Sequence, residues 1–138
     1  MAFYDGLGVR RVINAATTLT VVGGSPMPDE VLDAMRDAAS SFVDMHELHV
    51  AAGQHMARLT HNEAAYVTSG CAAALVLGTL GAITRGDPRA ISRMPAGEGM
   101  PTEVIVHAAH RIPYDLAIRL AGGRIVQIGN VQPAGTVG

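Results

Sequence analysis

The chain has 138 residues, of which 49% are apolar and 16% are charged, and its formal net charge is -2. This composition excludes a disordered chain and a coiled coil, and it offers no polybasic surface for nucleic acid or an anionic membrane. The single cysteine, Cys71, excludes an intrachain disulfide, and no secretory signal opens the sequence, so a cytoplasmic protein is expected. The chain contains ten arginines and no lysine, so a mechanism that needs a lysine must find it elsewhere.

The first third of the chain predicts an arm followed by two helices. Residues 1–28 indicate extended segments and turns. A helix is predicted over 28–42, because Asp29 and Glu30 suit the positive end of a helix dipole and apolar residues recur at helical spacing. A second helix with its own apolar stripe is predicted over 44–59.

The middle of the chain predicts a strand over 64–68, a tight turn, and a helix over 71–84. That helix is apolar on nearly all sides, which is typical of a buried helix, and it is too short to span a bilayer. Closely spaced prolines and glycines predict a loop over 89–102.

The last third predicts a buried strand over 103–107, a helix over 112–121 and a strand over 124–128. Strands alternating with helices indicate an α/β fold with a parallel sheet flanked by helices. Three strands are too few for a well-covered sheet of this kind. The sequence therefore predicts an incomplete fold, with an arm at 1–28 and a partial domain at 29–138.

One candidate site is the turn at Ser69, Gly70 and Cys71, between the predicted strand and the apolar helix. The free N–H groups and the dipole of a helix N-terminus attract an anion such as phosphate. An ordinary tight turn with small packing residues is the alternative. The turn is no P-loop, because it lacks the Gly-Lys-Ser/Thr ending. Cys71 itself is expected to be a buried small residue rather than a nucleophile.

A second candidate site follows the predicted strand 103–107, where His107, His110 and Arg111 lie. Ligands of open α/β sheets bind at the carboxyl ends of strands, and a histidine there can stack on a flat ring or transfer protons. A solvated polar loop is the alternative. The histidines at 46, 49, 55 and 61 do not have the spacing of a zinc site, so no metal is expected.

Several motifs, weak alone, occur together in one order. They are Leu7–Ala16 with Thr18–Thr20, Gly23–Ser25 with Met27, Glu30–Met35, Phe42–Met45 with Glu47–Leu48, Ala52–Gly53, Glu63–Ala65 with Val67–Gly70 and Ala72–Ala74, Glu103–Ile105, His110–Arg111, Tyr114–Asp115 and Ala121–Gly122. In this order the chain resembles the SelA-like group of fold-type-I enzymes that use pyridoxal 5'-phosphate (PLP). That group includes L-seryl-tRNA(Sec) selenium transferase and D-glucosaminate-6-phosphate ammonia-lyase-like proteins.

The resemblance implies the N-terminal part of the PLP-dependent transferase (aspartate-aminotransferase-like) fold. It implies that Ser69, Gly70 and Cys71 hold the cofactor phosphate, and many relatives carry Ala where Cys71 stands. It further implies that His110 stacks on the pyridine ring, with Arg111 as an alternative contact to cofactor or substrate. Two residues of the arm are implied to approach the substrate, and relatives often carry Gly at the second of them. These residues are Asn14 and Thr17.

The same resemblance implies a PLP-dependent lyase or transferase that acts on an amino acid or amino sugar acid, by elimination, ammonia loss or selenium transfer. In the family, the lysine that forms a Schiff base with the cofactor and the acidic partner of the pyridine nitrogen lie further along the chain than residue 138. No catalytic residue is therefore assigned here, and the 138 residues are expected to be inactive alone.

Three alternatives stay open. One is a non-catalytic remnant of the PLP fold that binds a phosphate compound or a full-length partner, and another is an aminotransferase. A Rossmann-like nucleotide binder ranks low because Gly-x-Gly-x-x-Gly is missing. No membrane partner and no nucleic acid are expected, and the full-length form is expected to be a homo-oligomer.

Overall fold

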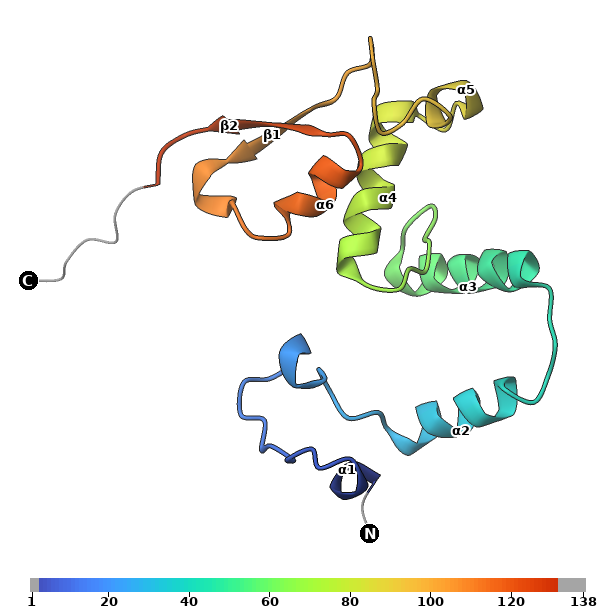
Figure 1. Ribbon diagram of the computed structural model, residues 1–138. Helices are drawn as coiled ribbons and strands as arrows, with labels where there is room; N and C mark the ends of the chain where they lie inside the picture. Colours follow the sequence, from blue (N-terminus) through green and yellow to red (C-terminus); the bar gives the residue numbers. More distant parts are fainter. Residues whose placement is uncertain (1–2, 132–138) are drawn as a thin grey trace, which may run out of the picture. The chain divides into compact units, whose positions relative to one another are not determined.

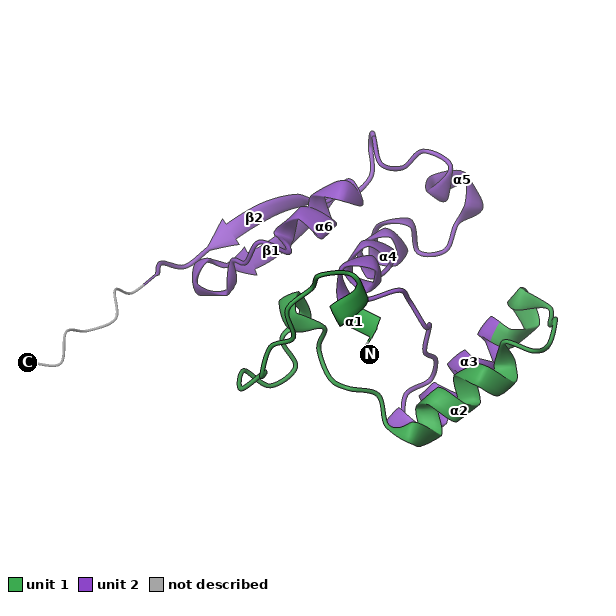
Figure 2. Ribbon diagram, turned by 60° about the horizontal axis from the view of Figure 1, so that its bottom comes forward, with its two compact units in different colours: residues 1–48 green, residues 49–138 purple. Residues whose placement is uncertain are grey.

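The computed structural model describes residues 3–131 (Figure 1). Contacts along the chain divide it into two units, 1–48 and 49–138, which Figure 2 shows in different colours. This division falls inside the second long helix. The arm expected at 1–28 stays a prediction, because a division by contacts does not test it.

The first unit contains two short helical turns, α1 (Phe3–Gly6) and η1 (Thr20–Val22), and one longer helix, α2 (Asp29–Ala38). None of its described residues is buried. The predicted helix over 28–42 is four residues too long at its C-terminal end. Ser40 donates from its main-chain N–H and from its hydroxyl to the Asp37 carbonyl, and this tight turn ends the helix before Phe42.

The helix α3 (Met45–Thr60) agrees with the prediction over 44–59. Its N-terminus is capped because the Asp44 carboxylate accepts a hydrogen bond from the Glu47 N–H at 2.9 Å. In its second half Gly53 is buried, and a Cβ at that position would collide with the Ala65 carbonyl oxygen. The helix and the segment that returns beside it therefore touch through their main chains.

That returning segment, 64–68, was predicted to be a strand, and this prediction is wrong. The segment carries no sheet pairing, because the sheet of the described residues contains only β1 (Glu103–His107) and β2 (Arg124–Ile128). Both of these strands were predicted with the same bounds. They pair in parallel, with Val104 opposite Ile125 and Val106 opposite Gln127.

The elements around the sheet are short except for one. The helix α4 (Cys71–Thr84) has the predicted bounds. The predicted loop over 89–102 instead begins with a short helix, α5 (Pro88–Ile91), and the predicted helix over 112–121 is shortened to α6 (Asp115–Leu120). Between β1 and α6 lies a single turn, η2 (Ala108–His110). The helix α4 packs on α5 and α6, and α6 packs on β2.

Burial differs from the sequence-based expectation. Only Ile83 and Thr84 of α4 are buried, and β1 alternates between exposed and half-buried positions, with Ile105 67% exposed. The core of this unit is therefore small and consists largely of alanines. Parallel strands are normally covered on both faces, so the apolar side chains of α4 and β1 are suited to contacts beyond the described residues.

Candidate functional site

The N-terminus of α4 begins at Gly70, whose main chain lies at φ 155° and ψ 174°. This region is essentially restricted to glycine. The Thr68 hydroxyl donates to the Gly70 carbonyl at 2.9 Å and accepts from the Gly70 N–H at 3.4 Å. These two hydrogen bonds between the Thr68 side chain and the Gly70 main chain stabilise the turn. No atom lies within 4 Å of where a Cβ on Gly70 would stand. The turn therefore has open space on that side, and glycine is needed for its conformation rather than for room.

The first hydrogen bond of α4 runs from the Ala74 N–H to the Gly70 carbonyl, at 3.0 Å. No residue of the described chain accepts a hydrogen bond from the N–H groups of Cys71, Ala72 or Ala73. By contrast, aspartates cap the starts of α3 and α5, where each carboxylate accepts a main-chain N–H. Three free donors at the positive end of a 14-residue helix are suited to an anion.

Ser69 and Cys71 flank this turn, and both are exposed. The expectation that Cys71 is buried is therefore wrong. The chain enters α4 with small residues, and the helix packs on its neighbours through its C-terminal half, where Ile83 is buried. The hydroxyl of Ser69 makes no hydrogen bond within the described chain, so it is available to the same anion.

The second candidate group begins where β1 ends. The His107 ring accepts a hydrogen bond on Nδ1 from the Ala109 N–H at 3.2 Å, and a Cβ on Gly129 would collide with the same ring. His107 is thus held between its own turn and the end of β2. The exposed ring of His110 lies 5.5 Å from it, centroid to centroid, with the two planes tilted by 50°.

Two of the donor groups of the Arg111 guanidinium are bound within the described chain, and the role of Arg111 as a cofactor or substrate contact stays a prediction. Its Nε donates to the Asp115 carboxylate on α6, and its NH1 donates to the Gln127 Oε1 on β2 at 2.9 Å. The hydrogen bond from Arg111 holds the pKa of Asp115 below its ordinary value of 3.8, against the opposing effect of burial. We refer to Arg111, Asp115 and Gln127 as the arginine clamp.

The sequence patterns did not reveal Asp115 and Gln127 as partners of Arg111. The four-residue spacing of Arg111 and Asp115 was one signal for an ion pair, because this spacing brings side chains together on a helix. Arg111, however, lies before the start of the predicted helix and of α6. Gln127 is sixteen residues from Arg111 and reaches it only because β1 and β2 pair in parallel.

The predicted cofactor-binding residues fall into two groups, both within the second unit. One group is the turn at Ser69, Gly70 and Cys71, and the other is His110 with Arg111. No hydrogen bond or ion pair among residues 3–131 joins the two groups.

Asn14 and Thr17 lie in the first unit and build a local loop. The Asn14 amide nitrogen donates to the Thr17 carbonyl at 2.6 Å, and its oxygen accepts from the Ala16 N–H at 2.8 Å. Thr17 has a φ of 59°, a left-handed conformation that favours glycine, which accounts for the glycine expected in relatives at this position. In this structure the polar atoms of Asn14 stabilise the loop itself.

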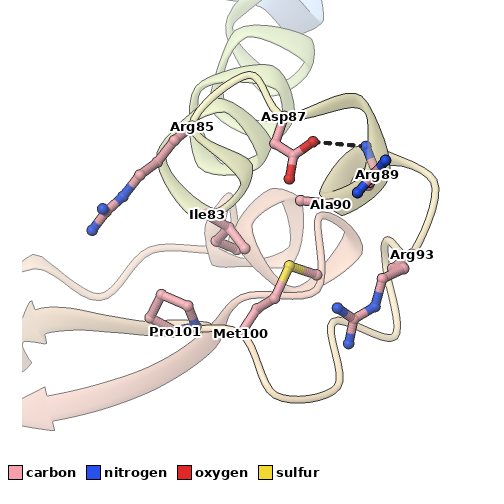
Figure 3. A pocket seen from close by; sticks show the side chains of 8 residues that line it. All are labelled: Ile83, Arg85, Asp87, Arg89, Ala90, Arg93, Met100 and Pro101. Atoms are coloured by element: carbon pink, nitrogen blue, oxygen red, sulfur yellow. Dashed lines mark hydrogen bonds between the residues drawn. The ribbon is translucent and has the colours of Figure 1, made fainter.

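A pocket of about 510 Å³ lies at the other end of α4 and is lined in part by Arg85, Arg89 and Arg93. The guanidinium groups do not converge (Figure 3): Arg85 points to one side, and Arg93 donates to the Glu98 carbonyl. The Asp87 carboxylate caps α5 through the Arg89 N–H at 3.0 Å. The arginines of this pocket are therefore not arranged around a common point, as an anion site would require.

Two further findings concern residues 3–131. They contain no cluster of three or more histidine, cysteine, aspartate or glutamate side chains arranged to hold a metal ion. Over the same range, no helix combines the length and the apolar character needed to cross a membrane.

Known proteins with similar sequences and structures are enzymes. The chain is 38% identical over 131 residues to D-glucosaminate-6-phosphate ammonia lyase of Salmonella typhimurium (strain 14028s / SGSC 2262), a match that covers 92% of this chain and 36% of that protein. It is 35% identical over 133 residues to 5'-C-glycyluridine monooxygenase-decarboxylase of a Streptomyces species, covering 93% and 33%. A solved structure of D-glucosaminate-6-phosphate ammonia-lyase matches with a TM-score of 0.88 and 38% identity, covering 98% of this chain and 38% of that one. No family model matches the chain.

The chain thus spans about a third of the length of the curated relatives it matches. Its parallel strands and flanking helices define one part of an α/β fold. The chain is homologous to one segment of the D-glucosaminate-6-phosphate ammonia-lyase group, which confirms the resemblance stated from its motifs.

Proposed function

We propose that this chain forms the phosphate-holding part of a PLP-dependent enzyme of fold type I, within the large domain of that fold. The reaction proposed is ammonia loss, or a related elimination or transfer, at an amino acid or amino sugar acid. The single observation that carries the proposal is the N-terminus of α4, where three main-chain N–H groups have no acceptor in the described chain. The homology to an ammonia lyase supports the substrate class.

The residues present fit the phosphate of the cofactor. The N–H groups of Cys71, Ala72 and Ala73 would hold its oxygens, the Ser69 hydroxyl would add a donor, and Gly70 leaves open space beside them. His110, exposed and without a hydrogen-bond partner in the described chain, would cover the flat ring. When bound, PLP supplies an electron sink that stabilises negative charge at the substrate α-carbon.

The proton transfers of such a reaction need groups that these 138 residues do not supply. No lysine is present, and neither candidate group contains a carboxylate free to pair with a pyridine nitrogen: the Asp115 carboxylate is bound by Arg111. We therefore expect the 138 residues alone to release no ammonia from D-glucosaminate-6-phosphate. In the full-length form, we expect a homo-oligomer whose remaining chain completes the site.

A titration with 4'-deoxypyridoxine phosphate tests the proposal. This analogue has the ring and the phosphate of PLP but lacks the aldehyde, so it cannot react with the N-terminal amine. Amide resonances of Cys71, Ala72 and Ala73 and the ring resonances of His110 are expected to shift together and to saturate. Shifts that leave the α4 N-terminus unchanged would contradict the proposal.

A second titration with inorganic phosphate separates the enzyme segment from a non-catalytic phosphate binder, which the absence of lysine in the chain favours. A PLP site binds the analogue more tightly than phosphate, because the ring adds its own contacts. Equal affinities, with no shift at His110, would favour the non-catalytic binder.

A further inference from the structure

The structure assigns a positioning role to Asp115: through Arg111, this carboxylate fixes where His110 stands at the end of β1. The inference rests on the proposed function in one respect, the contact of His110 with the cofactor ring. The placement of His110 itself is a property of this chain and can be measured without any ligand.

The clamp holds Arg111 from two elements that are distant in sequence. Asp115 lies on α6 and accepts from Nε, and Gln127 lies on β2 and accepts from NH1. A guanidinium presents its donors in a rigid planar fork, so two acceptors on two elements fix both its position and its orientation. The side chain of Arg111 is thereby held at its end, and the Arg111 N–H also donates to the Ala108 carbonyl at 3.4 Å. His110 lies between these two residues and immediately precedes Arg111.

Asp115 is distinguished by its burial from the other acidic residues that pair with arginine. The Asp33–Arg36 and Glu103–Arg124 pairs have carboxylate side chains 71% and 58% exposed, whereas the Asp115 side chain is 10% exposed. Exposed ion pairs contribute little and exchange readily with water. Of the ion pairs formed within 3–131, the Asp115 pair is the one suited to holding a fixed geometry.

His110 is held from its other side by His107. The ring of His107 is fixed by the Ala109 N–H and by its close approach to Gly129. The His110 ring lies 5.5 Å from it. One exposed imidazole therefore stands between two anchored neighbours, although it makes no hydrogen bond of its own in the described chain. The two neighbours thus position the His110 ring for stacking, and both nitrogens of that ring remain without a hydrogen bond in the described chain.

The test compares Asp115→Ala and Asp115→Asn with wild type. Asp115→Ala removes the acceptor, and Asp115→Asn keeps an oxygen without the charge, so the effects are expected in that order. In the ligand-free chain, the cross-peaks between the His107 and His110 rings should weaken in Asp115→Ala. Affinity for 4'-deoxypyridoxine phosphate should fall by about three- to tenfold, while affinity for inorganic phosphate at the α4 turn stays unchanged.

Two further variants keep the test decisive. Glu103→Gln removes a carboxylate of an exposed ion pair at the opposite end of β1 and should change neither readout. Gln127→Leu removes one arm of the clamp at an exposed position, so it keeps the test available if Asp115→Ala does not fold, and it should weaken the same ring cross-peaks.

The outcomes for the inference and for the proposed function are separable. If wild type fails to bind the analogue, the proposed function falls, and the ring cross-peaks of the ligand-free variants still decide the role of Asp115. If wild type binds the analogue but Asp115→Ala and Gln127→Leu keep both the cross-peaks and the affinity, the positioning role is overturned and the proposed function stands. An equal loss of analogue and phosphate affinity in both Asp115→Ala and Gln127→Leu would also overturn it, since a positioning role predicts a loss confined to the analogue.

Discussion

The two parts of the candidate site are built in opposite ways. At the N-terminus of α4 the donors are main-chain N–H groups that have no partner within the described chain. At the junction of β1 and α6 the guanidinium of Arg111 is bound by Asp115 and Gln127. Under the proposed function, the first part would contribute its own main-chain donors to a ligand, whereas most of the second part would serve to place one exposed ring, that of His110.

The largest effect is expected from Gly70→Ala, which breaks the first part. A side chain at φ 155° and ψ 174° is strained by about 1–3 kcal/mol, and relief of that strain turns the N–H groups of α4 away from a common point. Affinity for phosphate and for the PLP analogue should both fall by about tenfold or more, measured by titration.

The control for that variant is Gly78→Ala in the same helix. An added Cβ at Gly78 meets no atom within 4 Å, so this change should raise helix stability by about 0.5–1 kcal/mol and leave binding unaltered. Retained binding in Gly70→Ala would show that the conformation of the turn does not form the site.

A smaller effect is expected from His110→Ala, which tests the second part alone. Loss of a stacked aromatic ring costs about 0.5–1.5 kcal/mol, so affinity for the PLP analogue should fall by about two- to tenfold. Affinity for inorganic phosphate should not change. His110→Phe keeps a flat ring and should retain most of the analogue affinity; if it loses as much as alanine does, the histidine acts through its nitrogens instead.

A pH titration tests the arginine clamp. The pKa of Asp115 is lower in the folded chain than its ordinary value of 3.8, mainly because Arg111 donates to the carboxylate, with a further attraction from Arg119. The unfolded chain therefore takes up this proton first. The clamp contributes its full stability above pH 3.8 and loses it as the pH falls through the lower, folded pKa.

Denaturant unfolding of wild type and Asp115→Asn at neutral pH and near pH 3 measures this contribution. Wild type should be the more stable protein at neutral pH, and the difference should narrow in acid. A difference that is constant with pH would mean that the charge of Asp115 is not involved.

How well the sequence predicted each region depended on how local its determinants are. The bounds of α4, β1 and β2 followed from apolar runs ended by glycine or by a turn, and these signals lie within the elements themselves. The segment 64–68 has the composition of a strand, but a strand also needs a neighbour to pair with. No residue of the segment carries that information.

The same limit applies to the candidate site. The turn that begins α4 could be predicted because Ser69, Gly70 and the small residues after them are consecutive, whereas its binding of an anion stays a prediction. The hydrogen-bond partners of Arg111 could not be predicted, because they come from α6 and β2, and the register of two parallel strands brings Gln127 to it. Burial was also overestimated for Cys71 and for most of α4, since an apolar helix is buried only where other elements cover it.

The smallest effect on ligand affinity is expected from Cys71→Ala, and this variant tests whether the ligand is held by the main chain or by the thiol. If the anion is held by main-chain N–H groups, replacing an exposed thiol with a methyl group leaves the donor at position 71 in place. Affinity for phosphate and for the PLP analogue should stay within about twofold of wild type. A loss as large as that of Gly70→Ala would mean that the thiol itself contacts the ligand, and the distinction between a main-chain site at α4 and a side-chain site at the end of β1 would no longer hold.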